Sequence, residues 1–306
     1  KKPLFEFAST AQPSFQSTYL KIVSQLFGSR ALITGSRDGI DELCGAIPSI
    51  PFAADENGRG PAWSSSAAGS EAEFALSLRV AVDSLVDYAK NLSERVLVEG
   101  ISVNSVRAVL DGTQKSELEI DKMRKNIAVL KRYLSKSKNE DAIALSSVAD
   151  FFVRRSIWLM CGASWAENAG FAGLNEIFAA GRNVNVLVLS DGEKMRKNIA
   201  EIAMSYSDVY VAKIAVCADS DHALKALREA DEYDGASLVI ADSRWDFAAQ
   251  KNATKNGDWI LYRFDPRRET EAKNPLQIDS RDFVAEKSAQ NAPEWKKLKY
   301  RTDQKW

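Results

Sequence analysis

The run Val184-Asn185-Val186-Leu187-Val188-Leu189 (VNVLVL) decides how this chain folds. Its apolar side chains are rich in β-branched residues and hardly interrupted by polar ones, which is typical of a strand buried on both faces of a sheet. Two further runs share this pattern, at 156–161 (SIWLMC) and 237–241 (SLVIA). Helix candidates lie between the runs, at 170–180, 199–206 and 223–230. This alternation predicts an α/β fold with a doubly wound, mainly parallel sheet.

Weaker signals extend this pattern toward both ends of the chain. The segments 31–34 and 259–264 are strand candidates, and 209–217 is either a strand or a strand passing into a helix. Helices are expected at 15–27, 71–98 and 116–134. The last of these has one apolar stripe, formed by Ile120, Met123, Ile127 and Leu130. Such a stripe favours either a contact with the core or a contact with a partner helix.

Composition excludes several classes of protein. The 306 residues include 41 basic and 42 acidic ones, so a net charge of −1 gives no long-range attraction to nucleic acid or anionic membranes. No apolar run approaches the roughly 20 residues of a membrane helix. The three cysteines, Cys44, Cys161 and Cys217, form no CxxC pair, which favours buried thiols in a reducing compartment. The single histidine, His222, lies in a predicted helix start, Asp219-Ser220-Asp221-His222.

Ligands of doubly wound sheets bind at the carboxyl ends of the strands. The turns after Met160, Leu189 and Ala241 are therefore the places where a site is expected.

Several blocks of the sequence, in order, resemble the thiamine-diphosphate-binding, C-terminal domain of pyruvate:ferredoxin (flavodoxin) oxidoreductases. The resemblance covers about 15–280 and is weak over 95–150. Its blocks are Phe27-Gly28, 48–52 (PSIPF), 58–63 (GRGPAW), 181–189 (GRNVNVLVL), 203–206 (AMSY), 209–212 (VYVA), 261–266 (LYRFDP) and 274–280 (NPLQIDS).

The resemblance implies a fold of the thiamine-diphosphate-binding type, in which the family binds that cofactor through Mg²⁺ beside a [4Fe–4S] cluster. The Gly-Asp-Gly run of the family falls on Gly162-Ala163-Ser164, where Ala163 has no oxygen for Mg²⁺. The next cofactor loop is shortened to 190–194, which includes Asp191. The positions of the four cluster thiolates fall on Ala11, Ser14, Gly39 and Trp245, none of which is a cysteine. These residues are therefore expected to be vestiges of two sites, and no cofactor or metal is expected on the chain.

The hypothesis that follows is a catalytically inactive relative, not an enzyme, acting as a structural or regulatory subunit of a metabolic or cytoskeletal assembly. The alternative is a non-catalytic domain of an oxidoreductase, of the pyruvate oxidoreductase or sulfite reductase type, whose redox centres lie outside this chain. A third possibility is an enzyme with altered chemistry. Its candidate residues, all near the carboxyl ends of predicted strands, are Cys161, Ser164, Glu167, Asp191, Asp242 and Arg244.

The expected organisation is one domain over 1–306, with an N-terminal half (1–95), a helical insertion or connector (96–150), a parallel α/β half (151–280) and a C-terminal tail (281–306). Other subunits of a complex, or a second copy in a dimer, are the expected partners; nucleic acid and membrane insertion are not. The expected location is a reducing intracellular compartment: the cytoplasm, with cytoskeletal association as one option, or an organelle matrix. One feature has no physical account at this level, the near-repeat of DKMRKNIA at 121–128 and EKMRKNIA at 193–200.

Overall fold

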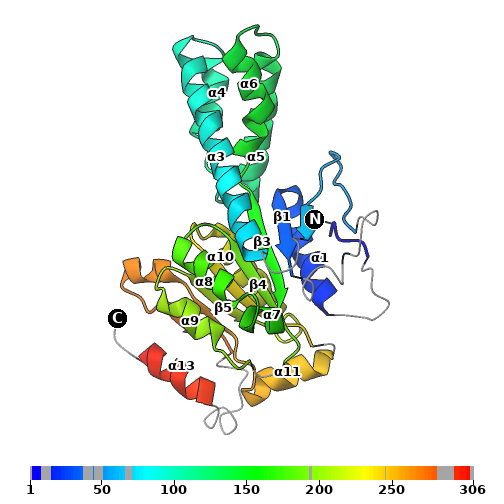
Figure 1. Ribbon diagram of the computed structural model, residues 1–306, viewed down its shortest axis with the longest axis vertical. Coiled ribbons are helices and arrows are strands. Elements are labelled where there is room, and N and C mark those ends of the chain that lie inside the picture. Colours follow the sequence, from blue (N-terminus) through cyan, green and yellow to red (C-terminus); the bar gives the residue numbers. More distant parts are fainter. Residues whose placement is uncertain are drawn as a thin grey trace. The chain divides into compact units, whose positions relative to one another are not determined.

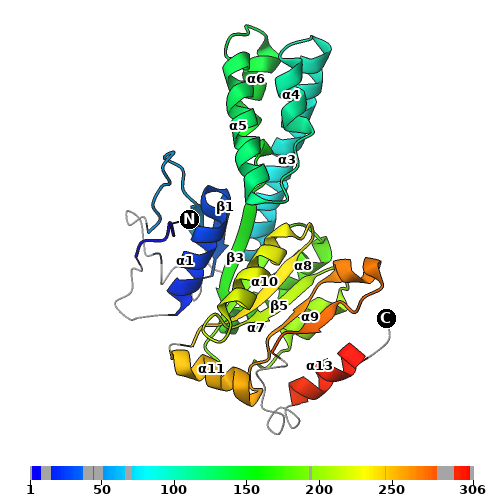
Figure 2. The same ribbon diagram turned by 180° about the vertical axis from the view of Figure 1, so that it is seen from behind.

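The structure is a computed structural model that describes residues 2–7, 15–36, 44, 51–65, 71–192, 195–244, 246–280 and 293–303 (Figures 1 and 2). The chain divides into two compact units. The first, called the sheet unit, contains Lys1–Leu76 and Ser156–Trp306, and the second, called the helical unit, contains Ser77–Arg155. The domain boundaries expected from the sequence stay a prediction.

An eight-stranded sheet forms the sheet unit, with strand order β2-β1-β3-β4-β6-β5-β7-β8. The pairings from β2 to β5 are parallel, while β7 is antiparallel to β5 and β8 to β7. The predicted doubly wound, mainly parallel sheet is thus confirmed. The strands are β1 (Ala31–Gly35), β2 (Ala62–Ser65), β3 (Ser156–Gly162), β4 (Asn185–Ser190), β5 (Tyr210–Ile214), β6 (Ser237–Asp242), β7 (Tyr262–Phe264) and β8 (Leu276–Ile278).

The three decisive runs form the centre of this sheet. Every residue of β3, β4 and β6 is buried, as expected for strands covered on both faces. One face carries Trp158, Leu187 and Val239, which pack in a single cluster with residues of two helices. These helices are α1 (Gln16–Phe27) and α10 (Ser220–Glu232).

The other helices of the sheet unit that the structure describes follow or connect strands. They are α7 (Ala163–Glu167), α8 (Phe171–Ala180), α9 (Ile199–Ser205), α11 (Phe247–Asn256) and α13 (Pro293–Asp303), with 3₁₀ turns η1 (Gly28–Arg30) and η4 (Pro266–Glu271). The predicted segment 209–217 is a strand that ends at Ile214. The start of α10 is also as predicted, because the Asp219 side chain accepts a hydrogen bond from the His222 backbone N–H at 2.9 Å.

The helical unit contains most of α3 (Glu71–Val98), together with α4 (Val103–Leu110), α5 (Glu117–Leu134), α6 (Glu140–Val148) and η3 (Ala149–Phe152). Its core joins Leu92 and Val96 of α3 to Val106 of α4 and Leu145 of α6. The apolar stripe of α5 is part of the same core, since Ile120, Met123, Ile127 and Leu130 are all buried. This decides between the two interpretations of that stripe in favour of core packing.

Among the described residues, no helix combines the length and the apolar character needed to cross a lipid bilayer.

Candidate functional site

The carboxyl ends of β3, β4 and β6 meet at one edge of the sheet, as the sequence predicts. The parallel registers set Gly162 opposite Leu189 and Ser190 opposite Asp242. The backbone N–H of Ser243 then donates to the Ser190 carbonyl at 2.7 Å, which joins the turns after β4 and β6. We call the ends of these strands and the turns after them the carboxyl edge.

The four residues predicted to be vestiges of the thiamine diphosphate site lie at the carboxyl edge. Gly162 is the last residue of β3, and α7 begins directly after it with Ala163 and Ser164. Asp191 follows the last residue of β4. That these residues are vestiges of a thiamine diphosphate site stays a prediction. The positions assigned to the cluster ligands, Ala11, Ser14, Gly39 and Trp245, lie outside the described residues.

An ion pair formed within one turn dominates the carboxyl edge. The Asp242 Oδ1 atom accepts hydrogen bonds from the backbone N–H of Arg244 at 3.1 Å and from its Nε at 2.9 Å. Arg244 Nη2 donates to the other oxygen, Oδ2. The Asp242 carboxylate is fully buried, and its hydrogen bonding raises the pKa of the Arg244 guanidinium, against the opposing effect of burial. The sequence predicted both residues as candidates for altered chemistry but did not indicate that they form an ion pair.

Gly192 makes room for this guanidinium. Its backbone has a φ of +90°, which side-chain-bearing residues rarely adopt. A Cβ atom at this position would lie 2.4 Å from Cδ and 2.6 Å from Nε of Arg244. The turn after β4 therefore lies directly against the Arg244 side chain, which covers this part of the carboxyl edge.

Buried polar contacts hold the backbone of this region in place. The Tyr19 hydroxyl of α1 donates to the Asp242 carbonyl at 2.8 Å and accepts from the Val216 N–H at 3.3 Å. Burial, the largest effect, raises the pKa of Tyr19, so the hydroxyl stays a donor. Gln250 of α11 donates to the Arg244 carbonyl at 3.1 Å and accepts from the Cys217 N–H at 3.2 Å. These contacts connect the turns after β5 and β6.

The other candidate residues for altered chemistry are dispersed. Cys161 is buried within β3. Glu167, at the end of α7, accepts a hydrogen bond from the Lys197 backbone N–H at 2.8 Å. Cys217, which the sequence did not propose as a catalytic residue, is partly exposed after β5, and burial and then the nearby Asp242 raise its pKa to about 11. Its thiol is therefore protonated near neutral pH and is a weak nucleophile.

The charges at the carboxyl edge do not fit a divalent metal ion. In the part of the chain that the structure describes, no three His, Cys, Asp or Glu residues gather closely enough to hold one. Both oxygens of Asp242 bind Arg244, and Asp191 also contributes to the high pKa of that guanidinium. A fixed positive charge thus stands beside the carboxylates that Mg²⁺ would need, so we derive no step through a metal-bound cofactor.

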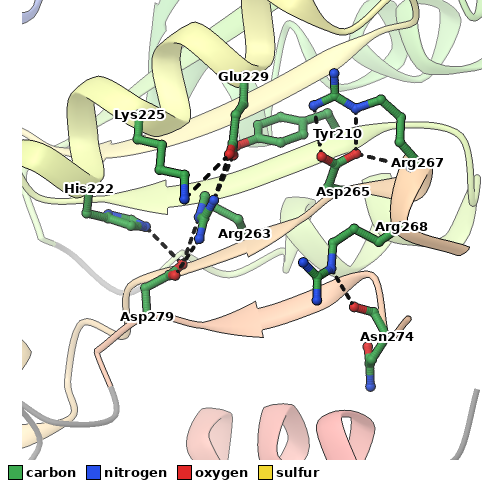
Figure 3. A network of polar contacts seen from close by, with 10 residues as sticks. All are labelled: Tyr210, His222, Lys225, Glu229, Arg263, Asp265, Arg267, Arg268, Asn274 and Asp279. Atoms are coloured by element: carbon green, nitrogen blue, oxygen red, sulfur yellow. Dashed lines mark hydrogen bonds and ion pairs between the residues drawn. The ribbon is translucent and has the colours of Figure 1, made fainter. Parts of the chain in front are cut away.

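A second polar cluster, the Arg263 network, lies between α10 and the antiparallel strands (Figure 3). Arg263 of β7 donates from Nη1 to Glu229 at 2.8 Å and from Nη2 to Asp279 at 2.7 Å. Tyr210 of β5 donates its hydroxyl proton to Glu229 at 2.9 Å, and His222 Nε2 lies 3.1 Å from Asp279. The network therefore ties β7 and the turn after β8 to α10.

Electrostatics support a structural role for this network. Burial would raise the pKa of Asp279, but hydrogen bonds from His222 and Arg263 more than offset it and lower that pKa. The same ion pairs raise the pKa of Arg263, although burial opposes the shift. His222 has no hydrogen-bond partner at Nδ1 among the described residues. The sequence gave no signal for this network, because the three charged residues are 16 to 50 positions apart.

The chain is similar to part of several oxidoreductases. It is 34% identical over 91% of its length to a putative pyruvate-flavodoxin oxidoreductase of Synechocystis and, over the same share, to a probable pyruvate-flavodoxin oxidoreductase of Escherichia coli. It is 30% identical, also over 91% of its length, to the pyruvate:ferredoxin oxidoreductase of Moorella thermoacetica. The chain spans about a quarter of the length of these relatives, 26% to 27%. No protein-family profile matches it.

These similarities contradict one expectation from the sequence. The chain was expected not to be an enzyme, whereas the proteins that it resembles are named as oxidoreductases. The expectation was wrong because it treated substitutions at a few positions as a loss of activity, whereas the similar proteins are named as enzymes.

Proposed function

Because this chain belongs to the family of the pyruvate-flavodoxin and pyruvate:ferredoxin oxidoreductases along nine-tenths of its length, we propose that it forms one domain of an oxidoreductase of this type. The whole enzyme would oxidise pyruvate and pass electrons to a flavodoxin or a ferredoxin. The observation that carries the proposal is 34% identity over 314 residues, a region that contains the complete parallel part of the sheet.

Within that oxidoreductase, we propose that this chain supplies structure and contacts with other subunits or domains. The redox centres then lie outside this chain. The position of Arg244 supports redox centres outside this chain. Its guanidinium lies against Gly192 and covers part of the edge where doubly wound sheets bind ligands. A reducing intracellular compartment agrees with the proposal, since iron–sulfur and flavodoxin chemistry operates there.

The test begins with the protein purified from its native source together with whatever polypeptides co-purify. We expect this material to reduce flavodoxin or ferredoxin in a pyruvate-dependent reaction. Iron and thiamine diphosphate would be measured in the same sample, and again in the separately expressed 306-residue chain. The cofactors should be present in the native material and missing from the isolated chain.

Two other results would each contradict a different part of the proposal. Native material that contains the chain but shows no pyruvate-dependent reduction would reject the oxidoreductase role. Thiamine diphosphate bound to the isolated chain at about one per chain would instead place a redox centre on it.

A further inference from the structure

One side of α5 carries an exposed row of residues at alternating spacings of four and three. The row consists of Leu118, Lys122, Lys125, Val129 and Arg132. All five side chains are exposed, Leu118 at 83% and Val129 at 43%. The row lies on the side of the helix opposite the buried stripe that α5 contributes to the core. We call these five residues the α5 seam.

The spacing of the seam is that of a coiled-coil contact. Alternating steps of four and three average 3.5 residues, the repeat that keeps one side of a helix against a partner helix. In the heptad notation a to g, Leu118 takes a d position and Val129 an a position. Leucine at d and a β-branched residue at a favour pairs of helices. All five side chains are exposed, so no helix in the described part of the chain fills this contact.

The three cations of the seam lack a counter-charge. Among the residues that the structure describes, no carboxylate forms an ion pair with Lys122, Lys125 or Arg132. Lys122 and Lys125 are three positions apart on one side of the helix, and like charges at such a spacing destabilise a helix. The folded chain therefore carries a repulsion that an acidic partner would relieve.

The carboxylates that border the seam are engaged with other groups. Asp121 binds Arg124 at 3.3 Å. Glu119 accepts a hydrogen bond from the Lys115 backbone N–H at 2.6 Å, just before the start of α5. These two contacts hold the nearest negative charges away from the cations of the seam.

Contacts on the inner side of α5 hold the seam in place. The Asn126 side chain donates to the Ala108 carbonyl of α4 at 2.9 Å. Lys131 binds Asp150 of η3 at 2.7 Å. A surface that is fixed before binding loses little conformational entropy on association, which favours affinity. The seam is therefore a preformed surface.

We propose that the α5 seam binds an acidic amphipathic helix of a partner protein. Two copies of the seam cannot serve each other, because cations would meet cations. A membrane-surface helix separates its basic and apolar residues on different faces, whereas the seam mixes them in one row. The proposal names the surface and the partner chemistry for the contact role proposed above, and it rests on that role.

The test uses the full 306-residue chain and a synthetic probe. The probe is a fluorescein-labelled peptide of three heptads, with leucine and glutamate alternating along its own seam. Fluorescence anisotropy should show saturable binding to wild type and at least tenfold weaker binding to K122E/K125E. A second peptide, with lysine in place of glutamate, should show the opposite preference. The matched control R107E/K138E reverses two exposed cations of the helical unit outside the seam and should bind like wild type.

A second variant distinguishes a helix contact from a general attraction between charges. L118S/V129S leaves every charge of the chain in place but removes the apolar side chains of the seam. It should also bind the acidic peptide at least tenfold more weakly than wild type. Circular dichroism on each variant would show that the helices remain folded, because every substituted side chain is exposed.

Several results would overturn the proposal. The acidic peptide could fail to bind wild type, or it could bind K122E/K125E or L118S/V129S as well as wild type. Retention of wild type on phosphatidylserine vesicles, lost in K122E/K125E, would assign the seam to a lipid surface instead. Self-association of wild type that K122E/K125E abolishes would assign it to a second copy. None of these measurements involves pyruvate oxidation, so their failure is distinct from failure of the oxidoreductase role.

Discussion

Gly192 shows how a single residue shapes the carboxyl edge. Its positive φ costs any side-chain-bearing residue backbone strain, and its missing Cβ leaves room for Arg244. We expect Gly192→Ala to lower the free energy of unfolding by about 2–4 kcal/mol, as strain and crowding add. Gly58→Ala is the control, because Gly58 also has positive φ (+70°) but an added Cβ would meet nothing within 4 Å. Urea denaturation measures both variants. An equal loss of unfolding free energy in Gly192→Ala and Gly58→Ala would show that Arg244 does not crowd the added Cβ.

Arg263 should contribute more to stability than Arg267, which is also paired but more exposed. Its side chain is 7% exposed and its removal leaves the carboxylates of Glu229 and Asp279 without their main partner. We expect Arg263→Gln to cost about 3–5 kcal/mol. Arg267→Gln, which breaks a pair with Asp265 on a side chain that is 43% exposed, should cost about 1 kcal/mol or less. Thermal or chemical unfolding compares the two variants. Similar losses of unfolding free energy would contradict a stabilising role for the Arg263 network.

Asp279 should make the protein sensitive to acid. Its pKa is lowered in the folded state, so its contribution to stability is present above the unfolded pKa and is lost as pH falls through the folded pKa. That window lies at and below the usual carboxyl range, about pH 4. Asp279→Asn should therefore be less stable than wild type at pH 7, with the gap closing toward pH 3. A gap that is constant between these pH values would rule out this linkage.

At the scale of the element, the near-repeat shows that context decides structure. In α5, the residues of DKMRKNIA form a helix interior with Met123 and Ile127 buried. In the second copy, Asn198 is the N-cap of α9 and accepts a hydrogen bond from Glu201 N–H at 3.2 Å. The same six letters, MRKNIA, thus continue one helix and begin another. Local sequence alone could not have distinguished these outcomes, because the flanking apolar residues determine where each helix packs.

The two asparagines of the repeat provide a matched pair of variants. Asn198→Ala removes an N-cap and should cost about 1 kcal/mol. Asn126→Ala, at the equivalent position inside α5, loses one exposed hydrogen bond to the Ala108 carbonyl but gains helix propensity, so its cost should be close to zero. Guanidinium titration of both variants measures the difference. A larger loss for Asn126→Ala would contradict this account of capping.

Strands differ in how well the sequence predicts them, for physical reasons. The runs at 156–161 and 237–241 are almost coextensive with β3 and β6, since burial on both faces requires continuous apolar sequence. The sequence did not reveal β2 or β8. Strand β2 (AWSS) has exposed residues at the edge of the sheet, and β8 has only three residues. Short edge strands form through pairing with a neighbour, which a single sequence does not display.

At the scale of the whole molecule, the fold was more predictable than the function. Ordered blocks of core and turn residues identified the family, because many positions contribute to that comparison. The pairing of Asp242 with Arg244 and the Arg263 network were not predictable, since they depend on the spatial register of strands and helices. Inactivity was inferred from a few substituted positions, and the similar oxidoreductases contradict it.

The charge arrangement at the carboxyl edge leads to one expectation for the whole chain. Because Arg244 occupies the Asp242 carboxylate, added Mg²⁺ should find no strong site there and should not stabilise the folded state by linkage. The unfolding temperature of the isolated chain should be the same in millimolar Mg²⁺ and in EDTA. An increase of several degrees with Mg²⁺, absent with Na⁺ at equal ionic strength, would show that a metal site does form.

The strand order also has a consequence during protein synthesis. Among the described strands, β5 pairs only with β6 and β7, both of which follow it in the chain. A nascent chain that has not yet emerged beyond Asp242 thus presents Tyr210–Ile214 without a neighbouring strand, and β4 lacks the neighbour that later separates it from β5. Strands β6 and β7 must therefore leave the ribosome before β5 can pair with them and before β6 can pair with β4. Apolar strands that lack their pairing partners during synthesis are the kind of surface that chaperones bind.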